Sequence, residues 1–263
     1  MIREIDFERL SLLCEPRLSK KKPDVLLVRL CSNAMCFSKN GLCTIYEIEK
    51  SGEIIGVICR YGGAMTLCLF KKPDFDELCS FLSVAPITSL ECGAKTGRKI
   101  SKKLKLCRLS GRAMLMKKPK SYADYKVYQT QNVSDFFDVL KSADPFYKET
   151  SYEEYYCDVF YRSSLPAELF LAEYCGKKAA TVAIMHRFND IAIISDVSVL
   201  PDLRRRGLGG SIVAEVCKNI SSKGQLATLL CTSKNALSLY KKIGFKSCGR
   251  FCLISFNTKD DTK

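Results

Sequence analysis

The stretch that decides the fold is Ile191-Ala192-Ile193-Ile194-Ser195-Asp196-Val197-Ser198-Val199, followed after a four-residue turn by Arg204-Arg205-Arg206-Gly207-Leu208-Gly209-Gly210. The first segment is apolar and rich in β-branched residues, which predicts a buried strand. After the glycines, the apolar side chains of Ile212, Val213, Val216 and Ile220 recur on one face of an amphipathic helix. The sequence therefore predicts a buried strand whose end leads, through a basic and glycine-rich turn, into a helix.

That helix start has the chemistry of a diphosphate site. The first turn of a helix presents unpaired backbone N–H groups and about half a positive charge, which suits a phosphate. Glycines let a ligand approach the backbone without a Cβ in the way, and arginines add permanently charged, bidentate donors. We predict a cradle for a pyrophosphate made by Arg204, Arg205, Arg206, Gly207, Leu208, Gly209 and Gly210.

Two common phosphate motifs do not fit this stretch, because the Walker Lys-Ser/Thr ending is absent and the spacing is not that of the dinucleotide G-x-G-x-x-G. Arg-x-x-Gly-x-Gly-Gly after Val197-Ser198-Val199, with Leu239-Tyr240-Lys241-Lys242-Ile243-Gly244-Phe245 further on, resembles instead the GNAT superfamily of acyl-CoA-dependent N-acyltransferases. The resemblance covers roughly residues 126–256. It implies an α/β fold with a mixed, mostly antiparallel central sheet flanked by helices.

The resemblance also implies a reaction and a set of site residues. The expected reaction moves an acetyl group from acetyl-CoA to a primary amine by direct attack, with no acyl-enzyme. Tyr240 would protonate the departing thiolate, and the backbone of Val197, Ser198 and Val199 would pair with the pantetheine amides. The family commonly has Asn seven residues before that tyrosine. This position is Ser233 here and Asn235 lies two further on, so either side chain is a candidate for the pantetheine contact.

The general base is less defined by the sequence. At pH 7 an amine with a pKa near 10.4 is unprotonated in only about one molecule in 2,500, so a group must take its proton. The acid that the family often has on the strand before Tyr240 would fall near Thr228, which cannot act as a base. Asp196, Glu173 and Glu154 remain the candidates.

Composition restricts the class of protein. The chain of 263 residues can form one large or two small domains, and it has no apolar run of the ~18 residues that a membrane span requires. Fifteen cysteines without a C-x-x-C pair, together with a single histidine, argue against a metal site. Reduced, buried cysteines and the lack of a signal-peptide core at the start predict a cytoplasmic protein.

The net charge of +14 is uneven, with eleven Lys or Arg and no acid between Lys95 and Lys120. Such a run could attract nucleic acid or another anion. Grooves for single-stranded nucleic acid interleave aromatic residues for stacking, and this run has none, which favours a solvated basic face. We expect acetyl-CoA and an amine as partners, and neither nucleic acid nor a membrane; the oligomeric state stays open.

The two halves of the chain follow the same order of predicted elements: hairpin, strand, helix, strand. In the first half these are 44–49 with 54–59, 64–70, 74–84 and 88–92; in the second they are 169–174 with 180–185, 191–199, 207–222 and 227–231. We therefore predict a tandem pair of domains, 1–120 and 121–263. The first has Lys71-Lys72-Pro73-Asp74-Phe75-Asp76 in place of the glycine-rich turn, so it is expected to be a degenerate copy without a cofactor site.

Other segments give weaker predictions. Residues 3–14 have the pattern of a short amphipathic helix, and residues 24–36 fit either a strand or a helix. Residues 121–165 hold eight of the twelve tyrosines, where the resemblance implies the wall of the acceptor side. These tyrosines could contact a substrate or only pack against the sheet. His186 lies at an expected strand end, where a role in the chemistry is not the favoured interpretation.

Two functions are consistent with these patterns. The first is an acetyl-CoA-dependent N-acetyltransferase, which Tyr240 and the complete cradle favour. The second is a non-catalytic module of the same fold that binds acyl-CoA or a macromolecular partner, which the absence of an obvious base favours.

Overall fold

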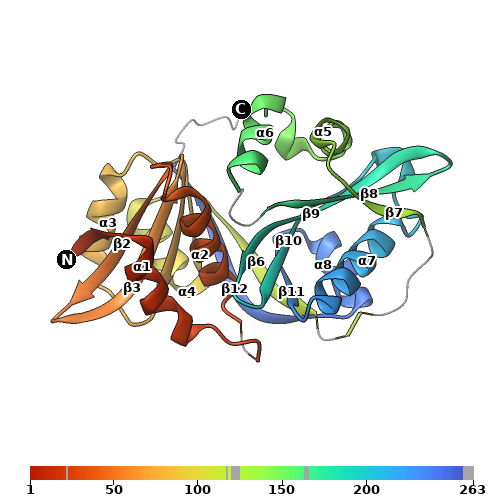
Figure 1. Cartoon of the computed structure of the whole chain (residues 1–263). Helices are drawn as coiled ribbons and strands as arrows, with labels where there is room; N and C mark the ends of the chain where they lie inside the picture. The colour runs from red at the N-terminus through yellow and green to blue at the C-terminus, as the bar shows by residue number, and fades with distance from the viewer. Residues whose placement is uncertain (22, 117, 120–124, 163–165, 257–263) are drawn as a thin grey trace. The chain divides into compact units, whose positions relative to one another are not determined.

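The computed structural model describes residues 1–21, 23–116, 118–119, 125–162 and 166–256, and divides the chain into two compact units (Figure 1). The N-terminal unit consists of Met1–Ala113 together with the chain from Cys248 onward. The C-terminal unit is Met114–Ser247. The sequence-based boundary between residues 120 and 121 instead places everything after it in one domain, so the two divisions differ mainly in the terminal strand.

The N-terminal unit is a mixed sheet with helices. Its elements are β1 (Ile2–Ile5), α1 (Phe7–Cys14), α2 (Val25–Phe37), β2 (Cys43–Lys50), β3 (Glu53–Tyr61), β4 (Ala64–Leu69), α3 (Phe75–Val84), β5 (Ser89–Gly93), α4 (Ala94–Leu104) and the start of β6 (Arg108–Met116). The strand order is β1-β2-β3-β4-β5-β12, where β12 is Phe245–Ser255. The β4–β5 pair is parallel, and the β1–β2, β2–β3, β3–β4 and β5–β12 pairs are antiparallel. The predicted hairpin, third strand, helix and following strand are all present.

Two predictions for this unit needed the tertiary structure. Residues 3–14 are not one helix, because Ile2–Ile5 pairs with β2 and the Asp6 side chain then caps α1 by accepting from the backbone N–H of Arg9. Residues 24–36 form a helix, because Asp24 caps its first turn in the same way. The sequence did not predict α4, which carries the first part of the basic run.

The C-terminal unit has the same architecture. Its elements are β7 (Val127–Thr130), α5 (Val133–Ala143), the short 3₁₀ helix η2 (Pro145–Tyr147), α6 (Tyr152–Tyr161), β8 (Glu168–Tyr174), β9 (Lys177–Phe188), β10 (Ile191–Val199), the 3₁₀ helix η4 (Pro201–Leu203), α7 (Leu208–Ser222), β11 (Leu226–Cys231) and α8 (Lys234–Ile243). The strand order is β6-β11-β10-β9-β8-β7. The β10–β11 ladder is parallel, and the β7–β8, β8–β9 and β9–β10 ladders are antiparallel.

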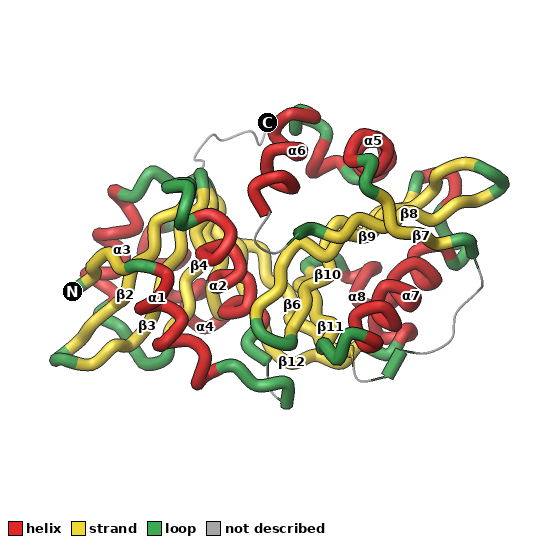
Figure 2. Tube along the Cα trace, in the orientation of Figure 1, coloured by secondary structure: helices red, strands yellow, loops and turns green. Residues whose placement is uncertain are grey.

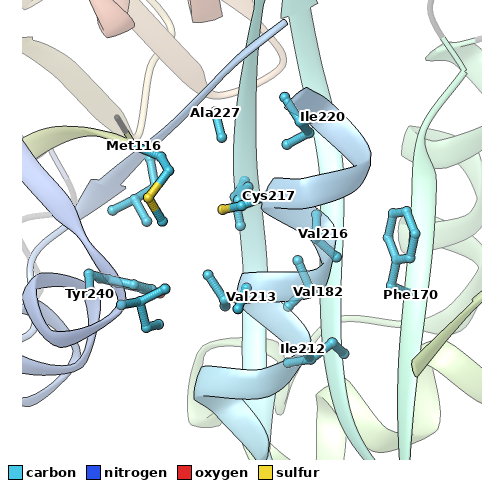
Figure 3. Packing of buried hydrophobic residues seen from close by; sticks show 14 of the residues in the cluster. Met116, Phe170, Val182, Ile212, Val213, Val216, Cys217, Ile220, Ala227 and Tyr240 are labelled. Atoms are coloured by element: carbon cyan, nitrogen blue, oxygen red, sulfur yellow. The ribbon is translucent and has the colours of Figure 1, made fainter. Parts of the chain in front are cut away.

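Helices cover both faces of the β8–β10 sheet, with α5 and α6 on one face and α7 and α8 on the other (Figure 2). On the α7 side, Val213, Val216 and Ile220 pack with Val182 of β9, and Tyr240 of α8 belongs to the same buried cluster (Figure 3). A second cluster under α5 and α6 is built around Phe136, Phe137, Leu140 and Tyr155, together with Leu169 and Met185 of the sheet. The candidate site described below lies where β10 passes between these two layers.

The internal repeat covers more of the chain than the sequence indicated. The order of strands and α-helices from β1 to β6 is repeated from β7 to β12: strand, two helices, three strands, helix, strand, helix, strand. The last strand of each repeat is divided between the units: residues 108–113 of β6 and 248–255 of β12 are assigned to the N-terminal unit, and their remaining residues to the C-terminal unit. Phe251–Ser255 of β12 pairs with Ser89–Gly93 of β5, while Met114 and Met116 of β6 are buried in the core of the C-terminal unit. The mixed α/β fold and its tandem arrangement are therefore confirmed.

Candidate donor and acceptor site

Strand β10 has an unpaired edge over its second half. It pairs with β9 as far as Val199, but with β11 only from Ile191 to Ile194. Beyond Ile194, the β10–β11 ladder contains no further described residue, so residues 195–199 have no described strand partner on the β11 side. Within this segment the carbonyls of Asp196 and Val199 accept from the side chains of Thr181 and Arg204. An extended ligand can add its own amide groups to such an edge in place of a strand. This is the geometry expected for Val197, Ser198 and Val199; the side chains of both valines pack on the core.

The turn between β10 and α7 presents a run of free donors. Arg205 and Gly207 have positive φ angles, 62° and 88°, which turn successive N–H groups toward one side. The first helical bond runs from the N–H of Ser211 to the carbonyl of Gly207, at 3.0 Å. Within the described part of the chain, no acceptor is paired with the backbone N–H groups of residues 205–210. Six consecutive free N–H groups at the start of a 15-residue helix form an anion cradle.

The small residues of this turn are required by packing as well as by the ligand. A Cβ placed on Gly209 would lie 3.3 Å from a methyl of Val199 and 3.5 Å from a methyl of Leu239. The side chain of Leu208 is buried in the core, so only its backbone can contribute to the cradle. The helix start therefore lies close against both β10 and α8.

The three arginines have different surroundings. Arg204 donates from Nε to the carbonyl of Val199 at 3.1 Å and from its terminal nitrogen to the carbonyl of Ala143 at 2.7 Å. Its guanidinium therefore ties β10 to the end of α5, which differs from the predicted role as a phosphate ligand. Arg206 donates to the hydroxyl of Tyr174 at 3.0 Å. Arg205 is exposed and pairs with no described side chain, so it is the arginine most available to an anion.

Tyr240 lies on α8, at the side of the cradle that Leu239 contacts. Its ring is buried and packs edge-on against Phe245, with 5.6 Å between centroids. No described residue forms a hydrogen bond with its hydroxyl. Burial, with a smaller effect of the nearby Cys231 and Cys217 thiols, raises the pKa of Tyr240 above its ordinary value. The phenol is therefore protonated at neutral pH and can serve only as a proton donor.

The two residues predicted as alternative pantetheine contacts lie at the start of α8. Ser233 is its N-cap, and its Oγ accepts from the backbone N–H of Ala236 at 3.3 Å. Asn235 is exposed in the first turn, and no described partner is bonded to its side chain. The cap uses Ser233 only as an acceptor, so the Ser233 hydroxyl and the Asn235 amide both remain possible donors to the pantetheine arm.

Asp196 is the acid that the structure places best. It lies at an irregularity of the β9–β10 ladder and has a φ of 50°, which turns its side chain toward α5 and α6. Its two carboxylate oxygens accept hydrogen bonds from the hydroxyls of Tyr147 (2.6 Å) and Tyr155 (2.9 Å). Burial raises the pKa of Asp196, and the two tyrosine hydrogen bonds oppose this by lowering it.

Tyr147 and Tyr155 are functional candidates that sequence reasoning did not single out. Both come from the tyrosine-rich segment, but its spacing does not indicate which rings turn inward. Only the packing of η2 and α6 against β10 brings these two hydroxyls to one carboxylate. No sequence pattern predicts a positive φ at a non-glycine residue within a strand. The direction of the Asp196 side chain could therefore not be predicted from the sequence.

The other acids are placed less favourably. Glu173 lies on β8, two strands from β10, and its Oε2 pairs with the ammonium of Lys126 at 2.8 Å. This ion pair lowers the pKa of Glu173, so the structure does not support it as the base. Glu154 closes the capping box at the start of α6 with Ser151. Thr228 is buried and donates to the carbonyl of Ala192 at 2.9 Å, as expected of a residue that cannot act as a base.

No metal site is found within the described residues, where no three His, Cys, Asp or Glu side chains are close enough to share an ion. His186 is buried on β9, with Nδ1 at 3.3 Å from a guanidinium nitrogen of Arg162. Of the helices described, none combines the length and apolar character needed to cross a bilayer.

The corresponding helix of the N-terminal unit is unsuited to phosphate. Asp74 caps α3, and its Oδ1 accepts from the backbone N–H groups of Asp76 (2.8 Å) and Glu77 (3.3 Å). The donors of the first turn are thus occupied, and the side chains of Asp76 and Glu77 add negative charge. The Asp74 carboxylate therefore takes the place that a phosphate would occupy at this helix start.

Comparison with known proteins extends these observations. Residues 174–252 match the family model described as FR47-like protein. Among curated proteins, glucosamine 6-phosphate N-acetyltransferase of Trypanosoma brucei brucei is 28% identical over 96 residues, which are 34% of this chain and 65% of that protein. The chain thus matches just under two thirds of the length of this relative.

Solved structures are similar over nearly the whole chain. An acetyltransferase from the GNAT family of Colwellia psychrerythraea is 15% identical with a TM-score of 0.58, covering 98% of this chain and 100% of that one. A Drosophila protein has a TM-score of 0.68 at 13% identity, with coverages of 98% and 99%. A tandem GNAT protein from the clavulanic acid biosynthesis pathway has a TM-score of 0.59 at 11% identity, covering 99% of both chains. Residues 174–252 are thus similar to the FR47-like family, and the whole chain has the fold of these GNAT structures, with two copies of the fold following one another.

Proposed function

We propose that the C-terminal unit is an N-acetyltransferase that moves the acetyl group of acetyl-CoA to a primary amine. The observation that carries this proposal is the run of six free N–H groups at residues 205–210, directly after the unpaired edge of β10. A diphosphate fits the first feature and an amide-containing chain fits the second, so the two together match coenzyme A. The FR47-like match over residues 174–252 and the acetyltransferase among the curated relatives support the same activity.

In this proposal the donor supplies an activated acyl carbon as a thioester, and the protein positions it and moves protons. The turn of residues 205–210 holds the diphosphate, with Arg205 adding charge. The backbone of Val197 and Val199 orients the pantetheine arm along β10. Ser233 and Asn235 remain candidates for a further contact with that arm.

Asp196 accepts the proton of the incoming ammonium, directly or through a water molecule. The raised pKa of its carboxylate makes it a stronger base than an ordinary aspartate, and the hydroxyls of Tyr147 and Tyr155 hold it in place. As the amine nitrogen bonds to the acyl carbon, the carbon–sulfur bond breaks and the sulfur becomes anionic. Tyr240, which is protonated at neutral pH, gives or shares its proton there. The nitrogen then loses a second proton, which replaces the one that Tyr240 gives to the sulfur, and the proton held by Asp196 is released to solvent.

We further propose that residues 1–120 form a degenerate copy that has lost the donor site, with residues 121–263 as the acetyltransferase domain. The capped, acidic start of α3 supports this division of labour. Most of the fifteen cysteines are buried as free thiols, which supports a reducing compartment such as the cytoplasm.

Release of free thiol from acetyl-CoA, measured with a panel of primary amines, tests the activity. Amine-dependent thiol release supports an enzyme. Tight binding of coenzyme A without turnover of any amine would favour the alternative, a non-catalytic acyl-CoA-binding or partner-binding module. Calorimetric titration with coenzyme A tests the division of labour, because a degenerate N-terminal copy predicts one site per chain and a functional one predicts two.

A further inference from the structure

Two tyrosines from neighbouring strands lie against the turn that begins α7. Tyr125 stands two residues before β7, and Tyr174 is the last residue of β8. Continued by two residues, the β7–β8 register places Tyr125 opposite Tyr174. Their ring centroids are 6.2 Å apart, and both rings pack against the hydrophobic cluster that contains α7. The position of this pair is therefore set by the sheet and the core.

Both tyrosines bind Arg206, which lies between the two residues of the turn that have a positive φ. The hydroxyl of Tyr125 donates to the carbonyl oxygen of Arg206 at 2.5 Å. The guanidinium of Arg206 donates to the hydroxyl of Tyr174 at 3.0 Å and lies 5.3 Å from the centre of that ring. Arg206 is exposed, yet contacts with two strands hold both its main chain and its side chain.

The contact from Tyr125 fixes the direction of one donor of the phosphate cradle. In a trans peptide the C=O of Arg206 and the N–H of Gly207 point in opposite directions. A carbonyl held toward Tyr125 therefore turns the N–H of Gly207 away from that ring. The next carbonyl, that of Gly207, accepts from the N–H of Ser211 at 3.0 Å and from its Oγ at 3.2 Å, which fixes the N–H of Leu208 in the same way.

The turn needs such contacts because its backbone is strained. Arg205 has a φ of 62°, in the left-handed region, which a residue with a Cβ keeps only where the surrounding structure holds it. Arg204 fixes the start of the turn through its side-chain hydrogen bonds, and Ser211 fixes the end. Between them, the Tyr125 hydroxyl is the side-chain group, among the described residues, that bonds to the main chain of residue 205 or 206.

We propose that Tyr125 is a positioning residue for the acetyl-CoA donor, whose hydroxyl holds the turn so that the N–H of Gly207 is directed at the diphosphate before the donor binds. The inference rests on the proposed acetyltransferase activity and extends it on the donor side. Tyr174 supports this role by holding the side chain of Arg206. A cradle that is already ordered binds an anion more tightly, because the free energy of ordering the turn is not subtracted from that of binding.

Calorimetry with coenzyme A tests the proposal. Tyr125→Phe removes the hydroxyl and keeps the ring, so we expect the variant to fold and its Kd for coenzyme A to be about three- to ten-fold higher, as for the loss of one hydrogen bond. The KM for acetyl-CoA should rise by a similar factor. At saturating donor, kcat should be unchanged, since the hydroxyl is bonded to the turn and not to the reacting atoms.

A matched control is Tyr128→Phe, the same substitution three residues further along the chain. Tyr128 packs with the cluster under α5 and α6, on the other face of the sheet, so its loss of a hydroxyl should leave the Kd for coenzyme A unchanged. A rise of equal size in both variants would mean that the β7 region is only loosened, and would overturn the proposal.

A second measurement needs no ligand. In protein labelled with ¹⁵N-glycine, the amide resonance of Gly207 should move in Tyr125→Phe, while those of the glycines outside residues 204–211 stay in place. An unchanged Kd, or a Gly207 resonance that does not move, would overturn the proposal. Failure of the proposed activity is distinct, because no amine would then release thiol, whereas the Kd and the Gly207 resonance are measured without an amine.

Discussion

Replacing Asp196 by Asn is the most direct test of the site, because it removes the proposed base while keeping the shape of the side chain. The amide oxygen can still accept from one of the two hydroxyls, Tyr147 or Tyr155, that bind the carboxylate. What it cannot do is take a proton from an ammonium group. The loss of activity should therefore be large, while stability at pH 7 should not fall.

The expected size follows from the acceptor's ionisation. Since only about one amine in 2,500 is unprotonated at pH 7, a positioned base can contribute up to about three orders of magnitude there. General bases typically contribute about 10²–10⁴-fold. We therefore expect kcat/KM of Asp196→Asn to be about 10²–10³-fold below that of the wild type at pH 7.

The pH dependence distinguishes a base from a structural residue. In the wild type, kcat/KM should fall as the pH drops through the pKa of Asp196, which burial places above the ordinary carboxyl range. The variant lacks this limb, and its rate should rise about ten-fold per pH unit as the free amine accumulates, up to about pH 10. The two profiles should therefore converge at high pH. A loss of equal size at pH 7 and pH 10 would refute the assignment of Asp196 as the base.

The stability of the Asp196→Asn variant is a second test, because the direction of its change with pH follows from the raised pKa of Asp196. Because folding raises the pKa of Asp196, the ionised carboxylate costs stability at every pH above its folded pKa, and this cost is absent below the ordinary carboxyl pKa. The variant should thus match or exceed the melting temperature of the wild type at pH 7. This difference in melting temperature should disappear below the ordinary carboxyl pKa, where Asp196 is protonated in both the folded and the unfolded chain. Glu215→Gln, which changes an exposed carboxylate paired with Lys218, is the matched control and should alter neither activity nor the pH profile.

Three further substitutions test the donor side. Tyr240→Phe should lower kcat by about 10²–10⁴-fold and leave the Kd for coenzyme A nearly unchanged, because the hydroxyl acts mainly on the developing thiolate. An unaltered single-turnover rate would show that the Tyr240 ring serves only in packing. Gly209→Val should abolish coenzyme A binding in calorimetry, since its side chain would meet Val199 and obstruct the backbone donors; normal binding by a folded variant would contradict the cradle. Arg204→Ala should lower the free energy of unfolding by roughly 1–3 kcal/mol in denaturant titrations, because it removes hydrogen bonds to Val199 and Ala143, and should weaken coenzyme A binding only modestly. Loss of binding without loss of stability would instead make Arg204 a direct ligand of the cofactor.

The sequence determined the local elements and the donor side of the site. Alternation of apolar residues and a Ser51-Gly52 turn predict the β2–β3 hairpin. The glycines at 207 and 209 indicate a helix start whose backbone a ligand can approach closely. Such features depend on a few consecutive residues, because hydrogen bonding within a turn and the period of a helix are local properties. The order of elements was enough to predict a tandem α/β fold.

The tertiary structure alone decided what depends on distant parts of the chain. The pairing of β12 with β5 joins residues more than a hundred positions apart in the sequence, and no local pattern records it. The same holds for Arg204, whose charge suggested a phosphate ligand and two of whose donors bind the backbone carbonyls of Val199 and Ala143. In the sequence, Asp196 was one of three equally suitable acids. The structure distinguishes it because the hydroxyls of Tyr147 and Tyr155 donate to its carboxylate. A residue type limits which bonds can form, and only the packing of α5, α6 and β10 decides which of them do.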